Sequence, residues 1–324
     1  MAQLTAEQPA HTLRNRTQER GFSQRLLPLM MIATGAAALL IGVFVLIGQA
    51  FPTEQLAFTG GDQGGLYVVD VNRQVSVPIF RMTTAAGQRG LSWSPDGNQI
   101  VFTALNGSDM EVYLIDADGN NLRNLSHSEG VDSAPTWLDD QHVVYWSLRD
   151  QGYRRVYVVD VETGDTQPLT GLMINNADTH YTWAPDGTHY AMVSWRSGQA
   201  DIYVRDINAS QSVRLTDSPK MDNNPAWSPD GSQIAFWSMR DNNLMRVYLM
   251  NADGSDQHAV TPGYTPISEM DWSVAWSPDG QSLAFSAVID RSPGIYRVEL
   301  ATGAVTRLLP LYPALLAPDL VWQP

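Results

Sequence analysis

The sequence contains no cysteine. Disulfides, cysteine-ligated zinc or iron–sulfur sites and thiol nucleophiles are therefore excluded, while the redox compartment stays open. Lysine is almost absent too, because Lys220 is the only one in the chain. Twenty basic side chains stand against 34 acidic ones, which gives a formal net charge of −14. A surface this acidic repels phosphate backbones, so we expect no nucleic-acid partner.

The common catalytic motifs are also missing from the sequence. It has no G-x-S-x-G, no H-E-x-x-H and no glycine-rich phosphate loop followed by a helix. These absences favour a protein that is not an enzyme. Acidic side chains are plentiful, however, so a hydrolase or lyase that uses paired carboxylates stays open as an alternative.

One long apolar run is present, at residues 26–50, and no charged residue interrupts it. Its length suits a helix that crosses a hydrocarbon layer roughly 30 Å thick. Four arginines precede the run and no basic residue follows it until Arg73. The positive-inside rule therefore predicts a cytoplasmic arm at 1–25, a signal-anchor helix at 26–50 in the inner membrane, and an extracytoplasmic, periplasmic domain at 51–324. A cleaved signal peptide is the alternative, but its apolar core usually spans only about 7–15 residues.

A short string recurs along the rest of the chain. Trp-Ser-Pro-Asp-Gly (WSPDG) stands at 93–97, 227–231 and 276–280, and a variant with alanine for serine stands at 183–187. With Trp137 and Trp322 added, the marker tryptophans recur every 44 to 49 residues. A period in the forties with strand-like content indicates a β-propeller.

Each repeat predicts four strands, beginning with the one that ends at the tryptophan. An apolar strand follows, such as QIVFTA at 99–104, then a strand with an early tyrosine, a tight turn and an edge strand. Residues 56–80 hold the last three strands of a repeat, and residues 319–324 hold only a tryptophan strand. We therefore predict an all-β fold of six four-stranded blades, closed by pairing of the N- and C-terminal strands.

These repeats resemble the TolB-type propeller family, built from PD40 or WD40-like repeats. The resemblance is in the D-x-x-P-x-W-S-P-D-G run, the apolar strand, the tyrosine strand and the terminal Leu-Thr, and it covers about residues 56–324. It implies a six-bladed propeller. TolB also carries an N-terminal α/β domain, and here we expect the membrane helix in its place, so the resemblance does not transfer TolB's own role.

The WSPDG string itself reads as a turn. Proline presets φ at the second position of a type I turn, aspartate suits the next position, and glycine accepts a positive φ. The tryptophan is a large apolar plate suited to packing between blades. We therefore interpret the string as the corner of a blade and not as an active-site element.

A set of carboxylates lies five residues before the marker tryptophans, in the segments that we expect at the mouth of the central channel. One interpretation is a divalent cation site, or a site for a cationic group of a partner. The other is that each carboxylate hydrogen-bonds within its own loop. The four residues are Asp132, Asp178, Asp222 and Asp271, with Gln88 and Ala317 at the remaining two positions.

Three arginines also occupy matching places, in the loop after the second strand of consecutive repeats: Arg149, Arg196 and Arg240. They are candidates for a partner interface, where arginine is favoured. A structural role is the alternative, with exposed ion pairs such as Arg149 with Asp150 and Arg240 with Asp241.

Together these features predict a membrane-anchored, non-enzymatic propeller. We expect it to bind other envelope or membrane proteins, as an interaction module or as an accessory subunit of a membrane complex. The alternative is a protein that binds a metal or small ligand, or a hydrolase or lyase, through the four aspartates. No other cofactor is predicted.

Overall fold

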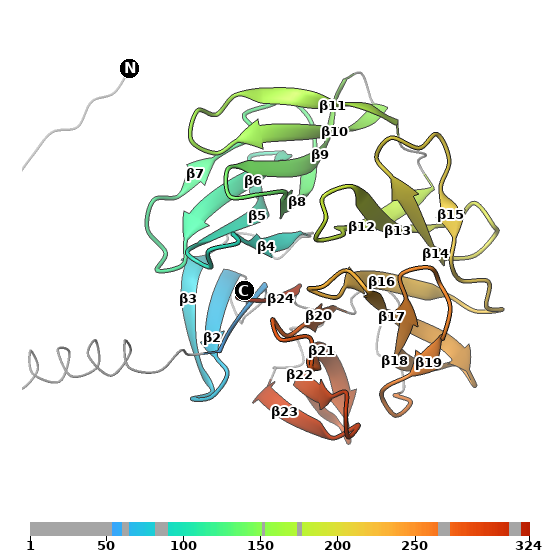
Figure 1. Cartoon of the computed structure of the whole chain (residues 1–324). Coiled ribbons are helices and arrows are strands. Elements are labelled where there is room, and N and C mark those ends of the chain that lie inside the picture. Colours follow the sequence, from blue (N-terminus) through green and yellow to red (C-terminus); the bar gives the residue numbers. More distant parts are fainter. Residues whose placement is uncertain are drawn as a thin grey trace, which may run out of the picture. The chain divides into compact units, whose positions relative to one another are not determined.

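The computed structural model describes residues 54–59, 65–81, 90–150, 153–173, 177–264, 273–310 and 319–324. Within them the chain forms six antiparallel sheets of four strands each. Figure 1 shows these sheets as blades around a central axis, with β4, β8, β12, β16, β20 and β24 near the middle and the last strand of each blade at the periphery. The predicted all-β, six-bladed propeller is confirmed.

Five blades follow the chain in order, and the first is assembled from both ends. Blade 1 contains β24 (Leu320–Trp322), β1 (Gln55–Thr59), β2 (Gly65–Asp70) and β3 (Val75–Arg81). Blade 2 contains β4 (Leu91–Trp93), β5 (Gln99–Asn106), β6 (Asp109–Asp116) and β7 (Arg123–Asn124). Blade 3 contains β8 (Asp132–Trp137), β9 (His142–Asp150), β10 (Tyr153–Asp160) and β11 (Thr166–Met173).

The other three blades repeat this plan. Blade 4 contains β12 (Asp178–Trp183), β13 (His189–Ser194), β14 (Asp201–Asp206) and β15 (Val213–Arg214). Blade 5 contains β16 (Asp222–Trp227), β17 (Gln233–Asp241), β18 (Leu244–Asn251) and β19 (His258–Ala259). Blade 6 contains β20 (Val274–Trp276), β21 (Ser282–Ile289), β22 (Ser292–Glu299) and β23 (Val305–Pro310).

The described core is divided among the junctions between blades. Six clusters of buried side chains each join two neighbouring blades, and a marker tryptophan lies in or against every one of them. Trp276 packs with blade 5, for example, and its indole N–H donates to Ala226 O at 3.0 Å. The tryptophan therefore holds its own blade against the preceding one, as the sequence predicted.

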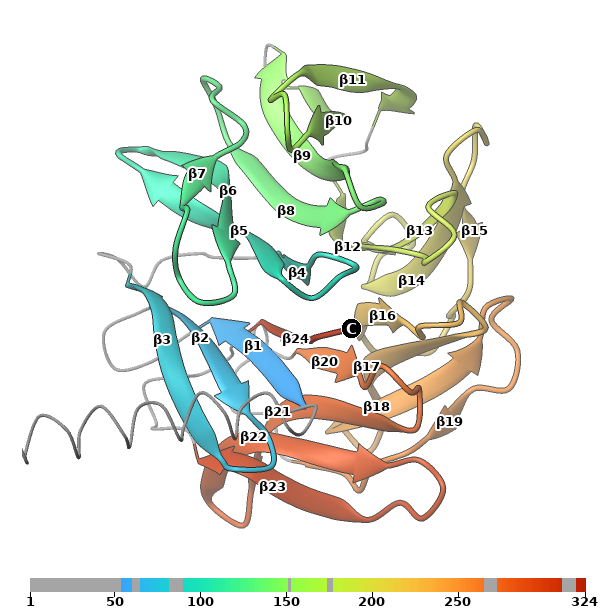
Figure 2. The same ribbon diagram turned by 60° about the vertical axis from the view of Figure 1, so that its left-hand side comes forward.

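The ring is closed by the two ends of the described chain. β1 pairs with β24 in an antiparallel register that places Leu56 opposite Trp322. Trp93 Nε1 donates to Val321 O at 3.2 Å, which ties blade 2 to the C-terminal strand. Figure 2 shows β24 lying between β1 and the strands of blade 6. This closure satisfies the strand edges that an open ring would expose.

The predicted arm at 1–25 and the predicted membrane helix at 26–50 lie outside the described residues. No helix among the described residues is long and apolar enough to cross a bilayer. Thr53–Pro324 forms one compact unit, which contains the whole propeller.

Candidate functional site

Three of the four predicted aspartates begin the innermost strands of blades 3, 4 and 5. Asp132, Asp178 and Asp222 are the first residues of β8, β12 and β16, and their exposed fractions are 0%, 3% and 0%. Buried carboxylates require partners, since an isolated buried charge is costly. Asp271, the fourth candidate, lies outside the described residues.

Each of these three carboxylates is paired with the candidate arginine of its own blade. Arg196 Nη2 lies 2.8 Å from both oxygens of Asp178. The Nη2 atoms of the other two arginines lie 3.3 and 2.9 Å from Oδ2 of their aspartates. The two sets that the sequence suggested separately are therefore one set of ion pairs: Arg149 with Asp132, Arg196 with Asp178 and Arg240 with Asp222.

The surroundings of the arginine also repeat in the three blades. In blade 5, Arg240 Nε donates to Ser238 Oγ at 2.8 Å, and its guanidinium carbon lies 4.6 Å from the ring centroid of Tyr248. Arg149 and Arg196 make the same contacts with the serine and tyrosine at the matching positions. The cation–π contact with tyrosine and the hydrogen bond to serine orient the guanidinium group toward the carboxylate.

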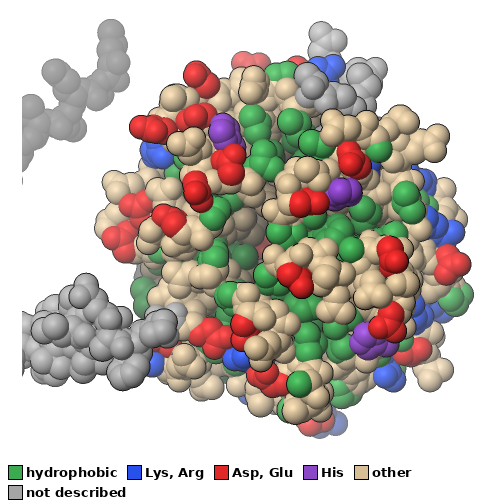
Figure 3. All heavy atoms as spheres, in the orientation of Figure 1, with side chains coloured by type: hydrophobic (Ala, Val, Ile, Leu, Met, Phe, Trp, Pro, Cys, Tyr) green, Lys and Arg blue, Asp and Glu red, His purple; other side chains and the backbone are tan. Residues whose placement is uncertain are grey.

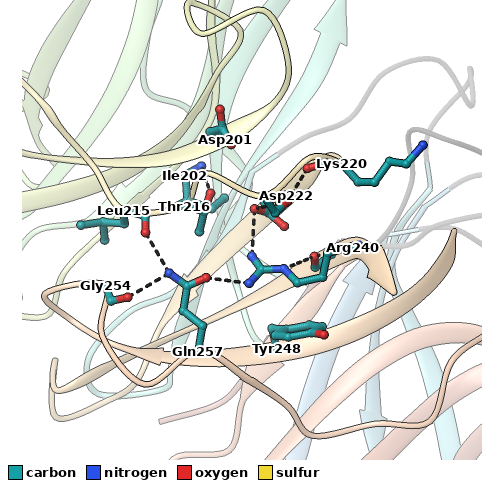
Figure 4. A network of polar contacts seen from close by, with 12 residues as sticks. Asp201, Ile202, Leu215, Thr216, Lys220, Asp222, Arg240, Tyr248, Gly254 and Gln257 are labelled. Atoms are coloured by element: carbon teal, nitrogen blue, oxygen red, sulfur yellow. Dashed lines mark hydrogen bonds and ion pairs between the residues drawn. The ribbon is translucent and has the colours of Figure 1, made fainter. Parts of the chain in front are cut away.

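Figure 4 shows the blade 5 network from close by. Arg240 Nη1 donates to Gln257 Oε1 at 2.7 Å, and Gln257 Nε2 in turn donates to Leu215 O in blade 4 at 2.9 Å. Asp222 also accepts from Ser218 Oγ at 3.0 Å. The network therefore links the last strand of one blade to the first strand of the next, which favours the local, structural role of these residues.

The predicted surface ion pairs with the next residue do not form. Asp150 accepts from Tyr157 Oη at 2.6 Å and pairs with Arg155 at 3.3 Å, and Asp241 is bonded to Tyr248 and Arg246 in the same way. Burial explains the difference. Asp132 and Asp222 are enclosed and need a cation, whereas the side chains of Asp150 and Asp241 are 36% and 40% exposed.

A cation at these aspartates stays a prediction. Each carboxylate already has a guanidinium beside it, although Oδ1 of Asp132 and of Asp222 has no hydrogen-bond partner among the described residues. Within the described ranges no group of three or more His, Asp or Glu side chains is arranged to hold a metal ion. The interface role of the arginines also stays a prediction. The arginine side chains are only 18% to 34% exposed, so most of the surface of each side chain is buried within its own blade.

A second feature lies on the opposite face, where the WSPDG turns end the innermost strands. A cavity of about 340 Å³ opens there, lined by all six blades. Its wall includes the tryptophan–proline corners of blades 4 and 5, and Figure 3 shows hydrophobic side chains gathered at the centre of this face. The marker tryptophans in the wall are Trp137, Trp183, Trp227, Trp276 and Trp322.

Exposed aspartates surround this cavity, one from each of the five turns after a marker tryptophan. Figure 3 shows acidic side chains spaced around the central hydrophobic area. The hydrogen bond from Ser228 Oγ is the largest of several that lower the pKa of Asp230 to about 2, and Ser94 and Ser277 lower the pKa values of two others in the same way. The rim therefore stays negatively charged well into the acid range. Its residues are Asp96, Asp139, Asp186, Asp230 and Asp279.

The same bonds confirm that WSPDG is the corner of a blade. Ser94 Oγ donates to Asp96 Oδ1 at 2.6 Å, and the backbone N–H of Asn98 donates to the same oxygen at 3.0 Å. Gly97 has φ of +69°, which glycine adopts without strain. The sequence did not reveal that five of these corners would surround one cavity, because that depends on how the blades close.

A closed ring of six four-stranded blades whose inner strands surround a cavity is a six-bladed β-propeller. The family model described as the TolB beta propeller domain matches residues 56–183 and 179–310. The chain therefore belongs to the PD40 family of TolB β-propeller domains.

Known relatives agree with this assignment. The chain is 27% identical over 150 residues to the Tol-Pal system protein TolB of Francisella tularensis subsp. mediasiatica. That match covers 45% of this chain but only 34% of the relative, so the chain corresponds to about a third of the relative's length.

Among solved structures, TolB from Acinetobacter baumannii superposes with a TM-score of 0.68 at 18% identity, over 84% of this chain and 67% of that one. A putative TolB from Agrobacterium tumefaciens gives 0.58 at 18% identity, over 84% and 99%. At these identities the superpositions show the fold alone.

Proposed function

We propose that this chain is a membrane-anchored, extracytoplasmic propeller that binds other envelope proteins. It acts either as an interaction module or as an accessory subunit of a membrane complex. The observation that carries the proposal is the cavity on the WSPDG face, which joins a tryptophan- and proline-rich centre to a polar rim. Protein interfaces have this arrangement, with aromatic residues enriched at the core and a polar, solvated rim.

Two further points support a binding role. The relative from Francisella tularensis is named as a Tol-Pal system protein, that is, as one component of a system. The aspartates on the other face were the basis for the metal or hydrolase alternative, and each of them is already paired with an arginine of its own blade. The proposal does not require any of the three ion pairs to open.

Site-specific photo-crosslinking in intact cells tests the binding role. A photoreactive residue at Leu138 lies in the cavity wall, and one at Asp217, an exposed residue on the opposite face, serves as the control. We expect Leu138 to capture a discrete partner band that mass spectrometry assigns to an envelope protein. No adduct from any cavity position in native membranes would overturn the proposal.

The absence of native cysteine allows a direct test of the anchor and its orientation. We expect a Ser232→Cys variant, exposed on the propeller, to react with a membrane-impermeant maleimide in spheroplasts, and a Thr5→Cys variant to react only after lysis. Carbonate extraction should leave the protein in the membrane fraction. Labelling of Thr5→Cys in intact spheroplasts would contradict the predicted orientation.

A further inference from the structure

The chain enters the propeller at Glu54, and hydrogen bonds fix this residue to two blades. Its backbone carbonyl accepts from Val71 N at 2.9 Å, and its carboxylate accepts from Arg297 Nη1 in blade 6 at 3.2 Å. The side chains of Glu54 and Arg297 are 28% and 20% exposed. The predicted membrane helix ends at Ala50, so only residues 51–53 separate it from the fixed part of the chain.

So short a connection limits how far the propeller can lie from the bilayer. The four Cα–Cα steps from Ala50 to Glu54 span at most about 14 Å. Within blade 1, Gln55 is opposite Asp70, and Asp70 is opposite Val75. Neighbouring strands are about 4.8 Å apart, so Val75, at the start of β3, lies roughly 10 Å from the point of entry. The anchor therefore holds the β2–β3 hairpin close to the bilayer surface.

The outer strand β3 has the kind of surface that a bilayer contact requires. Residues 72–78 are all exposed, and Val75 and Val77, which lie on the same side of the sheet, are 56% and 54% exposed. Figure 1 shows β3 at the periphery of blade 1. Residues 71–81 contain two arginines and no acidic residue, in a chain with a net charge of −14. Apolar side chains with basic residues beside them suit the boundary between lipid head groups and acyl chains.

A lipid surface fits this strand better than a strand of another protein does. Pro78 lies in the middle of β3 and has no N–H to donate, and a proline on an edge strand hinders pairing with a further strand. A bilayer surface requires no such pairing. Two half-exposed valines would hold a free protein on lipid only weakly, but the short connection makes the contact intramolecular, so a weak contact is sufficient.

We propose that β3 of blade 1 lies against the membrane that holds the anchor. Val75 and Val77 enter the head-group region, and Arg73, whose side chain is 44% exposed, meets lipid phosphates. The propeller is then edge-on to the bilayer, so both ends of its central axis stay accessible to partner proteins. This inference rests on the proposed function, because it requires the anchor, and it adds the orientation of the propeller.

Fluorescence quenching by labelled lipids tests the contact in the full-length protein, whose lack of native cysteine permits labelling at a single site. The fluorophore NBD is attached at Ser76→Cys on β3 and, as a matched control, at Ser210→Cys in the exposed turn before β15. Figure 1 shows β15 across the ring from β3. In phosphatidylcholine nanodiscs, lipid with a nitroxide on its head group should quench the emission at position 76 by about half and leave that at position 210 nearly unchanged. Equal quenching at the two positions would overturn the proposal.

The two valines are tested by substitution in the Ser76→Cys background. We expect Val75→Ser, Val77→Ser to reduce the quenching at position 76 about two- to fivefold, because less apolar surface leaves water. The control Val213→Ser changes a valine on β15 that is 65% exposed, and it should leave the quenching unchanged. Since all three valines are more than half exposed, the melting temperatures of the variants should stay close to that of the parent. Undiminished quenching in the double variant would contradict the proposed contact.

Two further measurements separate this inference from the proposed function. Carbonate extraction reports on the anchor alone, and release of the protein from the membrane would overturn both. Retention of the protein without quenching at position 76 would leave the anchored propeller in place and show that the contact of β3 with lipid is wrong. A label at position 76 that is protected from aqueous iodide, yet is not quenched by the lipid nitroxide, would mean that another protein or a second copy covers β3, and would likewise rule out the lipid contact.

Discussion

Arg240 Nη2 lies 2.9 Å from Asp222 Oδ2, inside the junction of blades 4 and 5. Asp222 is fully buried, and its other carboxylate oxygen has no hydrogen-bond partner among the described residues. The arginine is thus the main compensation for a charge that water does not reach. The pairing occurs in three consecutive blades, so it is a repeated structural element of this propeller.

Removing the arginine should therefore strongly destabilise the propeller. We expect Arg240→Leu to lower the free energy of unfolding by about 3 to 5 kcal/mol, because it leaves the Asp222 charge buried and unpaired. Urea denaturation measures the change. The control Arg155→Leu breaks a pair whose side chains are 39% and 36% exposed, and it should cost under about 1 kcal/mol. The double variant Asp222→Leu, Arg240→Leu should regain most of the stability that Arg240→Leu loses, because it removes the unpaired charge. Equal losses of stability in Arg240→Leu and Arg155→Leu would contradict this explanation.

Two tryptophans should respond very differently to truncation. Trp322 is 4% exposed at the junction that closes the ring, so we expect Trp322→Ala to cost about 3 to 5 kcal/mol. Trp195 is 50% exposed, and Trp195→Ala should change stability by less than about 0.5 kcal/mol. Thermal unfolding followed by circular dichroism measures both. A similar fall in Tm for the two variants would contradict the assignment of Trp322 to the closing core.

The glycines of the WSPDG corners should differ in how much an alanine substitution destabilises the protein, because their neighbours differ. Gly280 has φ of +67° with no atom within 4 Å of an added Cβ, so Gly280→Ala should cost only the left-handed strain of about 1 to 2 kcal/mol. At Gly187, φ is +65° and an added Cβ meets Leu138 Cδ1 at 2.8 Å, so Gly187→Ala should cost more. Chemical denaturation measures both free energies. Adding Leu138→Ala should remove the extra cost at Gly187 and not affect Gly280→Ala, and a lack of this coupling would contradict the contact.

The turn aspartates should make stability depend on pH on the acid side. The hydrogen bond that Ser228 Oγ donates to the ionised carboxylate is the main cause that lowers the pKa of Asp230 to about 2, below the ordinary value of 3.8 for an aspartate. A depressed pKa contributes stability above about pH 4, and this contribution is lost as pH falls from about 4 to 2. We expect Asp230→Asn to be less stable than the parent at pH 6 and to lose less stability between pH 4 and 2. Equal slopes in guanidinium denaturation across that range would contradict the assignment.

Much of the fold could be predicted because the repeat is a local signal. The marker tryptophans gave the period, and the incomplete repeats at 56–80 and 319–324 predicted the closure that β1 and β24 form. The candidate site was predicted only in part. Asp222 and Arg240 were each selected by their place in the repeat, yet their pairing was missed, although the separation of 17 or 18 residues in all three blades is a usable signal.

The sequence by itself determined the blade count, the turn at each WSPDG corner and the position of the ring closure, because these follow from hydrophobic alternation and turn chemistry within a few residues. Only the tertiary structure decided which buried aspartate meets which arginine, and that five corners surround one central cavity. Both depend on how neighbouring blades pack and on which groups that packing removes from water. Burial makes Asp222 half of an ion pair, whereas the corner aspartates stay exposed and accept hydrogen bonds within their own turns.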